Sequence, residues 1–126
     1  MDTIKKKILF AEDNESLTKI VLYMLGKEGY EVFHYPSGEN VVSGVKEHKP
    51  DLILTDVMMP VKNGLTILKE IKEDPDTKDI PLIFLSSNNN DLSIQDGLDL
   101  GAADYILKPF SIEDLSARIK KQLNIK

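Results

Sequence analysis

The chain has 126 residues, of which 41% are hydrophobic and 29% charged, a balance that favours one compact globular domain over a disordered or fibrous chain. Its net charge of -5 disfavours direct nucleic-acid binding, and the absence of cysteine excludes disulfide frameworks, thiolate zinc sites and thiol nucleophiles. The apolar run behind Lys5–Lys7 is too short for a signal peptide, and no stretch approaches the roughly 20 apolar residues of a membrane helix, so we expect a cytoplasmic protein without a membrane partner.

The first half of the chain predicts three strands and two helices. The apolar run 8–11 predicts a strand, and a helix ending at Gly29 follows it with apolar residues at helical spacing: Leu17, Ile20, Val21, Met24 and Leu25. Alternation over residues 31–35 predicts a half-exposed or edge strand. Ser37 is placed to cap a second helix, and Pro50-Asp51 introduces the apolar strand 52–55.

The second half continues the alternation of helix and strand. Gly64 opens a third helix, which the Asp74-Pro75 turn ends, and the strand 82–85 comes next. A fourth helix is expected from about Asp91 to Leu100, followed by a strand over residues 104–107. Ser111, with Asp114 three residues later, predicts the start of a last helix with these inward residues: Ile112, Leu115, Ile119 and Leu123.

Five strand and helix units of this kind predict an α/β fold. The first, third and fourth strands are apolar without alternation, as expected where helices cover both faces of a parallel sheet. We find no internal repeat, low-complexity tract or linker. The prediction is therefore one doubly wound domain over residues 1–126, and it is left open whether the chain acts alone or as part of a longer one.

Polar residues follow four of the predicted strands at the point where each strand ends. Glu12 and Asp13 follow the first strand, Asp56 the third, Ser86 the fourth and Lys108 the fifth. In an open parallel sheet these ends share one edge, where ligands bind. Three carboxylates so close together repel one another unless a cation neutralises them, and oxygen ligands suit Mg²⁺. One carboxylate then serves as a nucleophile toward a phosphoryl group, supported by the Lys108 ammonium.

The arrangement resembles the receiver domain of two-component response regulators over nearly the whole chain. Asp56-Val57-Met58-Met59-Pro60 with Gly64 after it looks like the phosphoacceptor segment, and Glu12-Asp13 looks like the acidic pair. Ser86 lies thirty residues after Asp56 (86 − 56), and Lys108-Pro109-Phe110 completes the set. The resemblance implies a CheY-like, flavodoxin-like (βα)5 fold with a five-stranded sheet in the order 2-1-3-4-5.

The resemblance also implies a role for each of these residues. Asp56 would be the phosphoacceptor, with catalytic support from Lys108 and Ser86. Asp13 and Asp56 would bind Mg²⁺ directly, Glu12 through water, and Met58 through its backbone carbonyl. Ser86 and Tyr105 would form the switch pair, and the Lys108-Pro109 peptide would be cis. In relatives, the positions of Met58 and Asn88 tune hydrolysis of the phosphoryl group.

The partners implied by the resemblance are a sensor histidine kinase or histidine phosphotransfer protein, and a downstream effector protein or output domain. The signalling face would consist of the fourth helix, the fifth strand and the fifth helix. Asp104 and Arg118 fit the charge pairs that join dimers of transcription-factor receivers, but Ile94 and Leu100 do not. The protein would catalyse only its own phosphorylation and dephosphorylation, and so would not be an enzyme acting on other substrates.

Other interpretations remain beside this one. Glu12-Asp13 is also compatible with an ordinary helix start, Met58-Met59 with packing, Tyr105 with an ordinary strand aromatic, and His34 and His48 with surface residues that lack partners. An aspartate-nucleophile phosphatase would need a second Asp two residues after the nucleophile, where Met58 stands. A receiver-like module that no longer takes phosphate would lack one of the acidic pair, Asp56 or Lys108, and all are present.

Overall fold

Five parallel strands form a single sheet in the order β2-β1-β3-β4-β5, as predicted. The structure is a computed structural model, and it describes residues 5–86 and 97–125. The strands lie within a residue or two of their predicted bounds: β1 (Lys7–Ala11), β2 (Glu31–Tyr35), β3 (Leu52–Asp56), β4 (Leu82–Ser86) and β5 (Asp104–Leu107).

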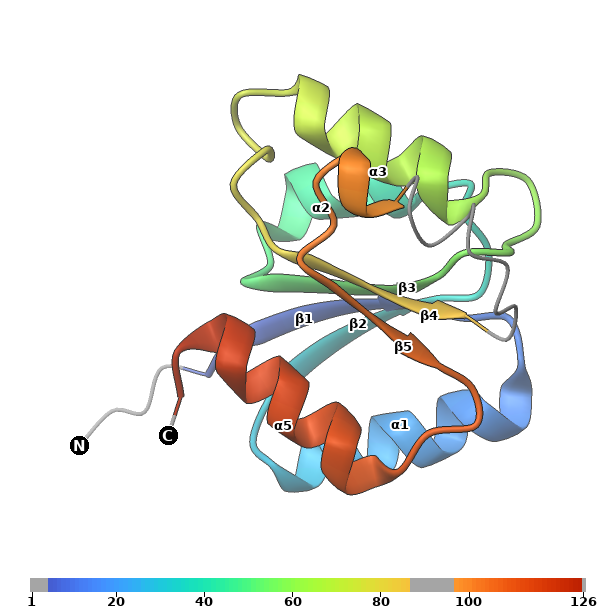
Figure 1. The fold of residues 1–126 in the computed structure, drawn as a ribbon, viewed down its shortest axis with the longest axis vertical. Coiled ribbons are helices and arrows are strands. Elements are labelled where there is room, and N and C mark those ends of the chain that lie inside the picture. The colour runs from blue at the N-terminus through green and yellow to red at the C-terminus, as the bar shows by residue number, and fades with distance from the viewer. Residues whose placement is uncertain (1–4, 87–96, 126) are drawn as a thin grey trace.

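Helices cover both faces of this sheet, with α1 and α5 on one face and α2 and α3 on the other (Figure 1). Their bounds are α1 (Glu15–Lys27), α2 (Val41–His48), α3 (Gly64–Glu73) and α5 (Ile112–Leu123). Most of the predicted fourth helix lies outside the described residues, but residues 97–99 are helical and Gly101 beyond them has a φ of 104°. Within the described residues, no helix has the length and apolar character needed to cross a membrane.

The two faces of the sheet bury two separate apolar clusters. Along β1, Ile8 and Phe10 point into the cluster beneath α1 and α5, whereas Leu9 and Ala11 point into the cluster beneath α2 and α3. All four side chains are fully buried. This is why β1, β3 and β4 are apolar without alternation, while the edge strand β2 has no buried residue.

Side-chain caps fix the starts of three helices. Asn14 accepts a hydrogen bond from the Leu17 amide, Asn63 from the Thr66 amide and Ser111 from the Asp114 amide. The prediction that Ser37 caps the second helix is wrong. Asn40 is the N-cap of α2, and Ser37 accepts from the Glu39 amide in the loop before it, which delays the helix by about a turn.

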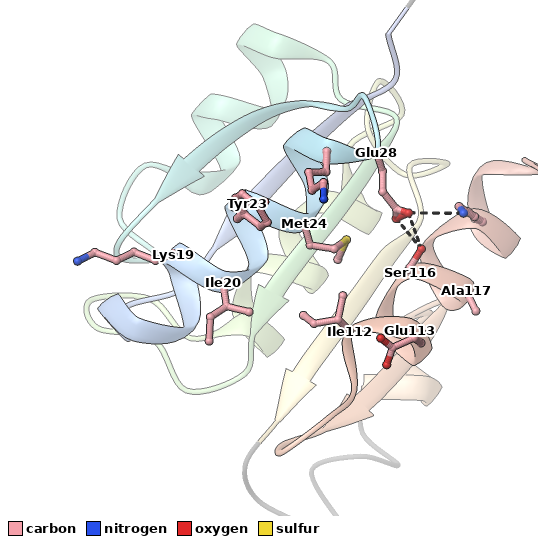
Figure 2. A pocket seen from close by; sticks show the side chains of 11 residues that line it. Lys19, Ile20, Tyr23, Met24, Glu28, Ile112, Glu113, Ser116 and Ala117 are labelled. Carbon is pink, nitrogen blue, oxygen red and sulfur yellow. Dashed lines mark hydrogen bonds and ion pairs between the residues drawn. The ribbon is translucent and has the colours of Figure 1, made fainter.

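One apolar residue of the first helix lies on its outer side. Ile20 shares the helical spacing of the other apolar residues, but it is 53% exposed, whereas Val21, Met24 and Leu25 are buried. The buried face of α1 consists of Thr18, Val21, Met24 and Leu25, and Ile20 is not part of it. Ile20 therefore belongs to the surface between α1 and α5, where the two helices form a groove (Figure 2).

The loop between β3 and α3 contains a residue in an unfavourable backbone conformation. Val61 has a φ of 72° and its side chain is 78% exposed, so no buried contact compensates for a β-branched residue there. We expect Val61→Gly to raise the free energy of unfolding by about 1 kcal/mol, because glycine adopts this conformation without a steric cost. Urea unfolding measures this, with Val42→Gly in α2 as a control that should lower stability; a loss at position 61 would contradict the expectation.

Candidate functional site

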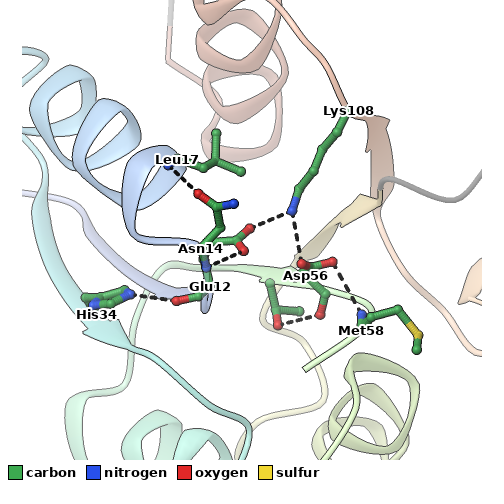
Figure 3. Close-up of polar contacts among 8 residues, drawn as sticks. Glu12, Asn14, Leu17, His34, Asp56, Met58 and Lys108 are labelled. Carbon is green, nitrogen blue, oxygen red and sulfur yellow. Dashed lines mark hydrogen bonds and ion pairs between the residues drawn. The ribbon is translucent and has the colours of Figure 1, made fainter. Parts of the chain in front are cut away.

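The carboxyl ends of β1, β3 and β5 bring Glu12, Asp13, Asp56 and Lys108 together (Figure 3 shows three of them). Glu12 and Asp13 directly follow β1, Asp56 is the last residue of β3, and Lys108 follows β5. β1 and β3 are hydrogen-bonded neighbours in the sheet, so their ends lie side by side. The sequence-based expectation that these side chains meet at one edge is confirmed.

Three carboxylates form the acidic part of the site. One oxygen from each of Glu12, Asp13 and Asp56 lies within 4.8 Å of the others. Glu12 and Asp56 are 1% and 7% exposed, respectively, whereas Asp13 faces solvent. Burial raises the pKa of the Glu12 carboxyl, although hydrogen bonds from Lys108 and from the Asn14 amide partly oppose that effect.

Lys108 joins two of these carboxylates. Its Nζ donates to Glu12 Oε1 at 2.8 Å and to Asp56 Oδ2 at 3.0 Å. Burial alone would lower the pKa of Lys108, but the hydrogen bonds to Glu12 and Asp56 outweigh burial, and the pKa lies above its ordinary value. The ammonium is therefore charged and fixed beside Asp56.

Two neighbours of Glu12 were missed by the sequence interpretation. The Asn14 amide donates to Glu12 Oε2 at 3.1 Å, while the Asn14 side chain caps α1 (Figure 3). The capping position of Asn14 before an amphipathic helix was the signal available in the sequence. His34 was expected to lack a partner, and this is wrong, since its Nε2 lies 3.0 Å from the Glu12 carbonyl oxygen. His34 is on the surface, as expected, and it contacts the site only through backbone.

The remaining predicted residues lie around this group. Ser86 is the last residue of β4 and is 4% exposed. The Met58 amide donates to Asp56 Oδ1 at 3.3 Å, and Met58 is 67% exposed, so this methionine is not part of the buried core (Figure 3). Tyr105 in β5 is half-buried against the cluster beneath α2 and α3. The Lys108-Pro109 peptide is cis, as the resemblance implied.

The donor set fits a hard divalent cation. All three clustered side chains offer carboxylate oxygens, and the described residues contain no cysteine. Oxygen ligands of this charge suit Mg²⁺, which usually binds one or two carboxylates and keeps water in its remaining positions. The exposure of Asp13 leaves the cluster open to solvent on that side.

Most of the chain, including the acidic cluster and Lys108, matches a known protein family. The family model described as "Response regulator receiver domain" matches residues 8–120, which includes the acidic cluster and Lys108. The chain belongs to this family. It is the receiver domain of a two-component response regulator, a signalling domain and not a conventional enzyme.

Named relatives and solved structures of receivers agree with this assignment. The DNA-binding response regulator MtrA of Mycobacterium tuberculosis is 32% identical over 98% of this chain. A putative response regulator from Chloroflexus aurantiacus has a TM-score of 0.90 and 29% identity, covering 96% of this chain and 99% of its own. The receiver domain of the sensor histidine kinase PA1611 from Pseudomonas aeruginosa has a TM-score of 0.88 and 27% identity, covering 96% and 99%, and was solved with a magnesium ion coordinated in its active-site cleft.

The receiver spans about half the length of the MtrA regulators that it matches, 53% of their chain. Those relatives are named as DNA-binding, so the exclusion of nucleic acid drawn from the net charge is not supported. The net charge of -5 was counted over the 126 residues of this chain alone.

Proposed function

We propose that this receiver accepts a phosphoryl group from a phosphohistidine donor onto Asp56 with Mg²⁺ as cofactor. The donor would be a sensor histidine kinase or a histidine phosphotransfer protein. One observation supports the proposal above all: a nearly buried aspartate lies within 4.8 Å of two further carboxylates and accepts a hydrogen bond from a lysine ammonium. The single domain over residues 1–126 remains a prediction.

Asp13 and Asp56 would bind Mg²⁺ directly, Glu12 through water and Met58 through its backbone carbonyl oxygen. When bound, the ion supplies positive charge that offsets the carboxylates and the oxygens of the incoming group. The three clustered carboxylates have the ligand chemistry that this role requires. The backbone amide of Asn14 supports the site because it donates a hydrogen bond to the Glu12 carboxylate.

In the transfer itself, an Asp56 carboxylate oxygen attacks phosphorus. A phosphorus–oxygen bond forms, while the phosphorus–nitrogen bond of the donor breaks and its electron pair leaves with the imidazole. Lys108, fixed 3.0 Å from Asp56, would donate to an oxygen of the transferred group. Ser86 would donate to another of these oxygens from the end of β4. The same residues would support later hydrolysis, and we propose no chemistry on other substrates.

We propose that the signal leaves through the face formed by residues 97–100, β5 and α5. Ser86 moving toward the phosphoryl group would let Tyr105 rotate inward, which shifts the population of two states. Leu98, Leu100 and Leu107 are 41%, 40% and 40% exposed on this face, as suits contact with an effector protein or output domain. The rest of the predicted fourth helix, including Ile94, lies outside the described residues, as does Asn88.

A dimer joined by Asp104 and Arg118 is not part of this proposal. Arg118 Nη1 donates to Asp104 at 2.9 and 3.0 Å within the same chain, and its Nε donates to Asp114. The Nη1 and Nε groups of Arg118 therefore already have partners within the same chain.

Incubation with Mg²⁺ and acetyl phosphate tests the proposed function. We expect intact-protein mass spectrometry to detect the addition of one phosphoryl group, which disappears when EDTA removes the metal. Beryllofluoride added with Mg²⁺ should shift the nuclear magnetic resonance signals of residues along β5 and α5. Removal of the metal with EDTA should reverse these shifts. A folded protein that gains no phosphoryl group under these conditions contradicts the proposal.

Asp13→Asn separates the electrostatics of the apo site from metal binding. Without metal, we expect the variant to be slightly more stable, because it removes one of three mutually repelling carboxylates. Its affinity for Mg²⁺ should fall about tenfold or more. Thermal unfolding over a Mg²⁺ titration measures both effects, with Asp79→Asn as a matched surface control. Equal Mg²⁺ stabilisation in Asp13→Asn and the unaltered protein would remove Asp13 from the ligand set.

A further inference from the structure

His34 on the edge strand β2 reaches the backbone of the acidic pair. Its Nε2 lies 3.0 Å from the Glu12 carbonyl oxygen, and Figure 3 shows the ring directed at that atom. A carbonyl oxygen only accepts hydrogen bonds, so Nε2 carries the hydrogen and donates it. The centroid of the imidazole also lies 5.6 Å from that of Phe10, its partner in the register of β1 and β2. Phe10 is fully buried, so this contact helps to hold the imidazole in place.

The imidazole lies where the backbone ladder between β1 and β2 stops. The Glu12 amide donates to the Tyr35 carbonyl oxygen at 3.1 Å. In a parallel pair the next bond would run from the amide of Ser37 to the Glu12 carbonyl oxygen. β2 ends at Tyr35, however, and among the described residues no backbone amide donates to that oxygen. The His34 side chain supplies a donor in its place.

This hydrogen bond bears on Asp13, because the Glu12 carbonyl and the Asp13 amide belong to one planar peptide unit. The Glu12 carboxylate has its own partners, Lys108 and the Asn14 amide. The Asp13 carboxylate is exposed, and within the part of the chain that the structure describes it has no hydrogen bond or ion pair. The direction of the Asp13 side chain toward Asp56 therefore depends on the orientation of its backbone.

We propose that His34 is a positioning residue for the Mg²⁺ site, which holds the peptide between Glu12 and Asp13 so that the Asp13 carboxylate stays beside Asp56. This inference rests on the proposed function, because it assumes that the acidic cluster binds the metal. His34 is not a ligand and acts only through backbone. Its hydrogen bond raises the fraction of metal-free molecules whose carboxylates are already arranged for binding, and the apparent dissociation constant falls as that fraction rises.

Two substitutions of His34 test the inference. His34→Leu removes the donor and keeps an apolar group against Phe10, whereas His34→Gln keeps an N–H group near the position of Nε2. We expect His34→Leu to raise the Mg²⁺ dissociation constant about fivefold, the effect of losing one hydrogen bond on an equilibrium. His34→Gln should stay within about twofold of the unaltered protein. Nuclear magnetic resonance signals of residues 12–14 over a Mg²⁺ titration at constant pH measure each dissociation constant.

His48→Leu is the matched control. The His48 ring stacks on Phe33 of the same strand with 3.8 Å between centroids, so both leucine substitutions remove an imidazole that packs on an aromatic ring. His48 is the last residue of α2, and its carbonyl oxygen accepts from Lys7 at the opposite end of β1 from Glu12. The Mg²⁺ dissociation constant of His48→Leu should therefore equal that of the unaltered protein. Circular dichroism checks that every variant is folded.

Phosphoryl uptake from acetyl phosphate separates positioning from a general loosening of the fold. In His34→Leu, the Mg²⁺ concentration that gives half-maximal uptake should rise about fivefold. The rate at saturating Mg²⁺ should stay that of the unaltered protein, because bound metal restores the arrangement of Asp13. A loosened fold would instead lower the rate at saturating Mg²⁺ and leave the dissociation constant unchanged.

Two outcomes would overturn the inference. One is an unchanged Mg²⁺ dissociation constant in His34→Leu, and the other is a His34→Gln variant that binds Mg²⁺ as weakly as His34→Leu does. Failure of the proposed function has a different signature, since the unaltered protein would then bind Mg²⁺ without taking up a phosphoryl group. In that case the Mg²⁺ dissociation constants of the variants still decide the role of His34.

Discussion

Asp56→Asn is expected to abolish phosphoryl uptake from acetyl phosphate. Asparagine has nearly the shape of aspartate, but its amide is a far weaker nucleophile than a carboxylate, so the aspartyl phosphate does not form. Intact-protein mass spectrometry before and after incubation with Mg²⁺ and acetyl phosphate measures the uptake. We expect a full phosphoryl adduct in the unaltered protein and none in the variant.

Asp76→Asn is the matched control for this experiment. Asp76 is exposed in the turn after α3, and the same chemical change there leaves the acidic cluster intact. Circular dichroism should show that both variants keep their helices. Labelling of Asp56→Asn at the unaltered rate would mean that another residue is the phosphoacceptor.

Lys108→Ala is expected to slow phosphoryl uptake about 100-fold to 1000-fold, because it removes a fixed charged donor beside the reacting group. Without metal, the same change should lower the free energy of unfolding by about 2 kcal/mol. The reason is that Glu12 and Asp56, both nearly buried, lose the ammonium that they share. Added Mg²⁺ should restore more stability to this variant than it adds to the unaltered protein.

The variant Lys108→Arg separates charge from geometry. Arginine keeps the positive charge but presents a planar fork in place of a compact ammonium, so stability should largely return while the rate remains reduced. If Lys108→Ala stops phosphoryl uptake but leaves the free energy of unfolding unchanged, Lys108 does not stabilise the buried carboxylates. If phosphoryl uptake is unchanged, Lys108 does not support the transfer.

The pH dependence of this contribution has a definite sign. The pKa of Lys108 is raised above its ordinary value of 10.5, so the stability from its ion pairs is fully present below that pH. It is lost as the pH rises through the higher pKa of the folded protein. The stability difference between the unaltered protein and Lys108→Ala should therefore be constant near neutrality and shrink only under strongly alkaline conditions.

The strands and the site could be predicted because a parallel sheet imposes simple rules. Doubly covered strands such as β3 must be apolar throughout, so Asp56 at its end marks where the buried run stops. The carboxyl ends of such strands share an edge, which places Glu12 and Asp56 together without knowledge of the loops. The positions of the site residues followed from these rules, whereas their roles remain predictions.

Loops and surfaces could not be predicted in the same way, because tertiary contacts decide them. Ser37 has the chemistry of a cap, but Gly38 packs closely on the Lys62 backbone and its amide donates to Pro60, so the loop continues to Asn40. Ile20 has the right spacing for burial, yet α5 lies to one side of it and leaves it in the groove. Local sequence contains neither of these contacts.

We propose that Glu12, Asp13 and Asp56 together hold a divalent cation beside the attacking carboxylate, and phosphoryl transfer depends on this ion. Diffraction from crystals soaked in Mn²⁺, a hard cation that replaces Mg²⁺ at oxygen sites, tests it most directly through the anomalous signal of manganese. We predict one strong anomalous peak in contact with carboxylate oxygens of both Asp13 and Asp56. A fully soaked crystal with no peak there, or with its main peak elsewhere on the surface, would contradict the claim.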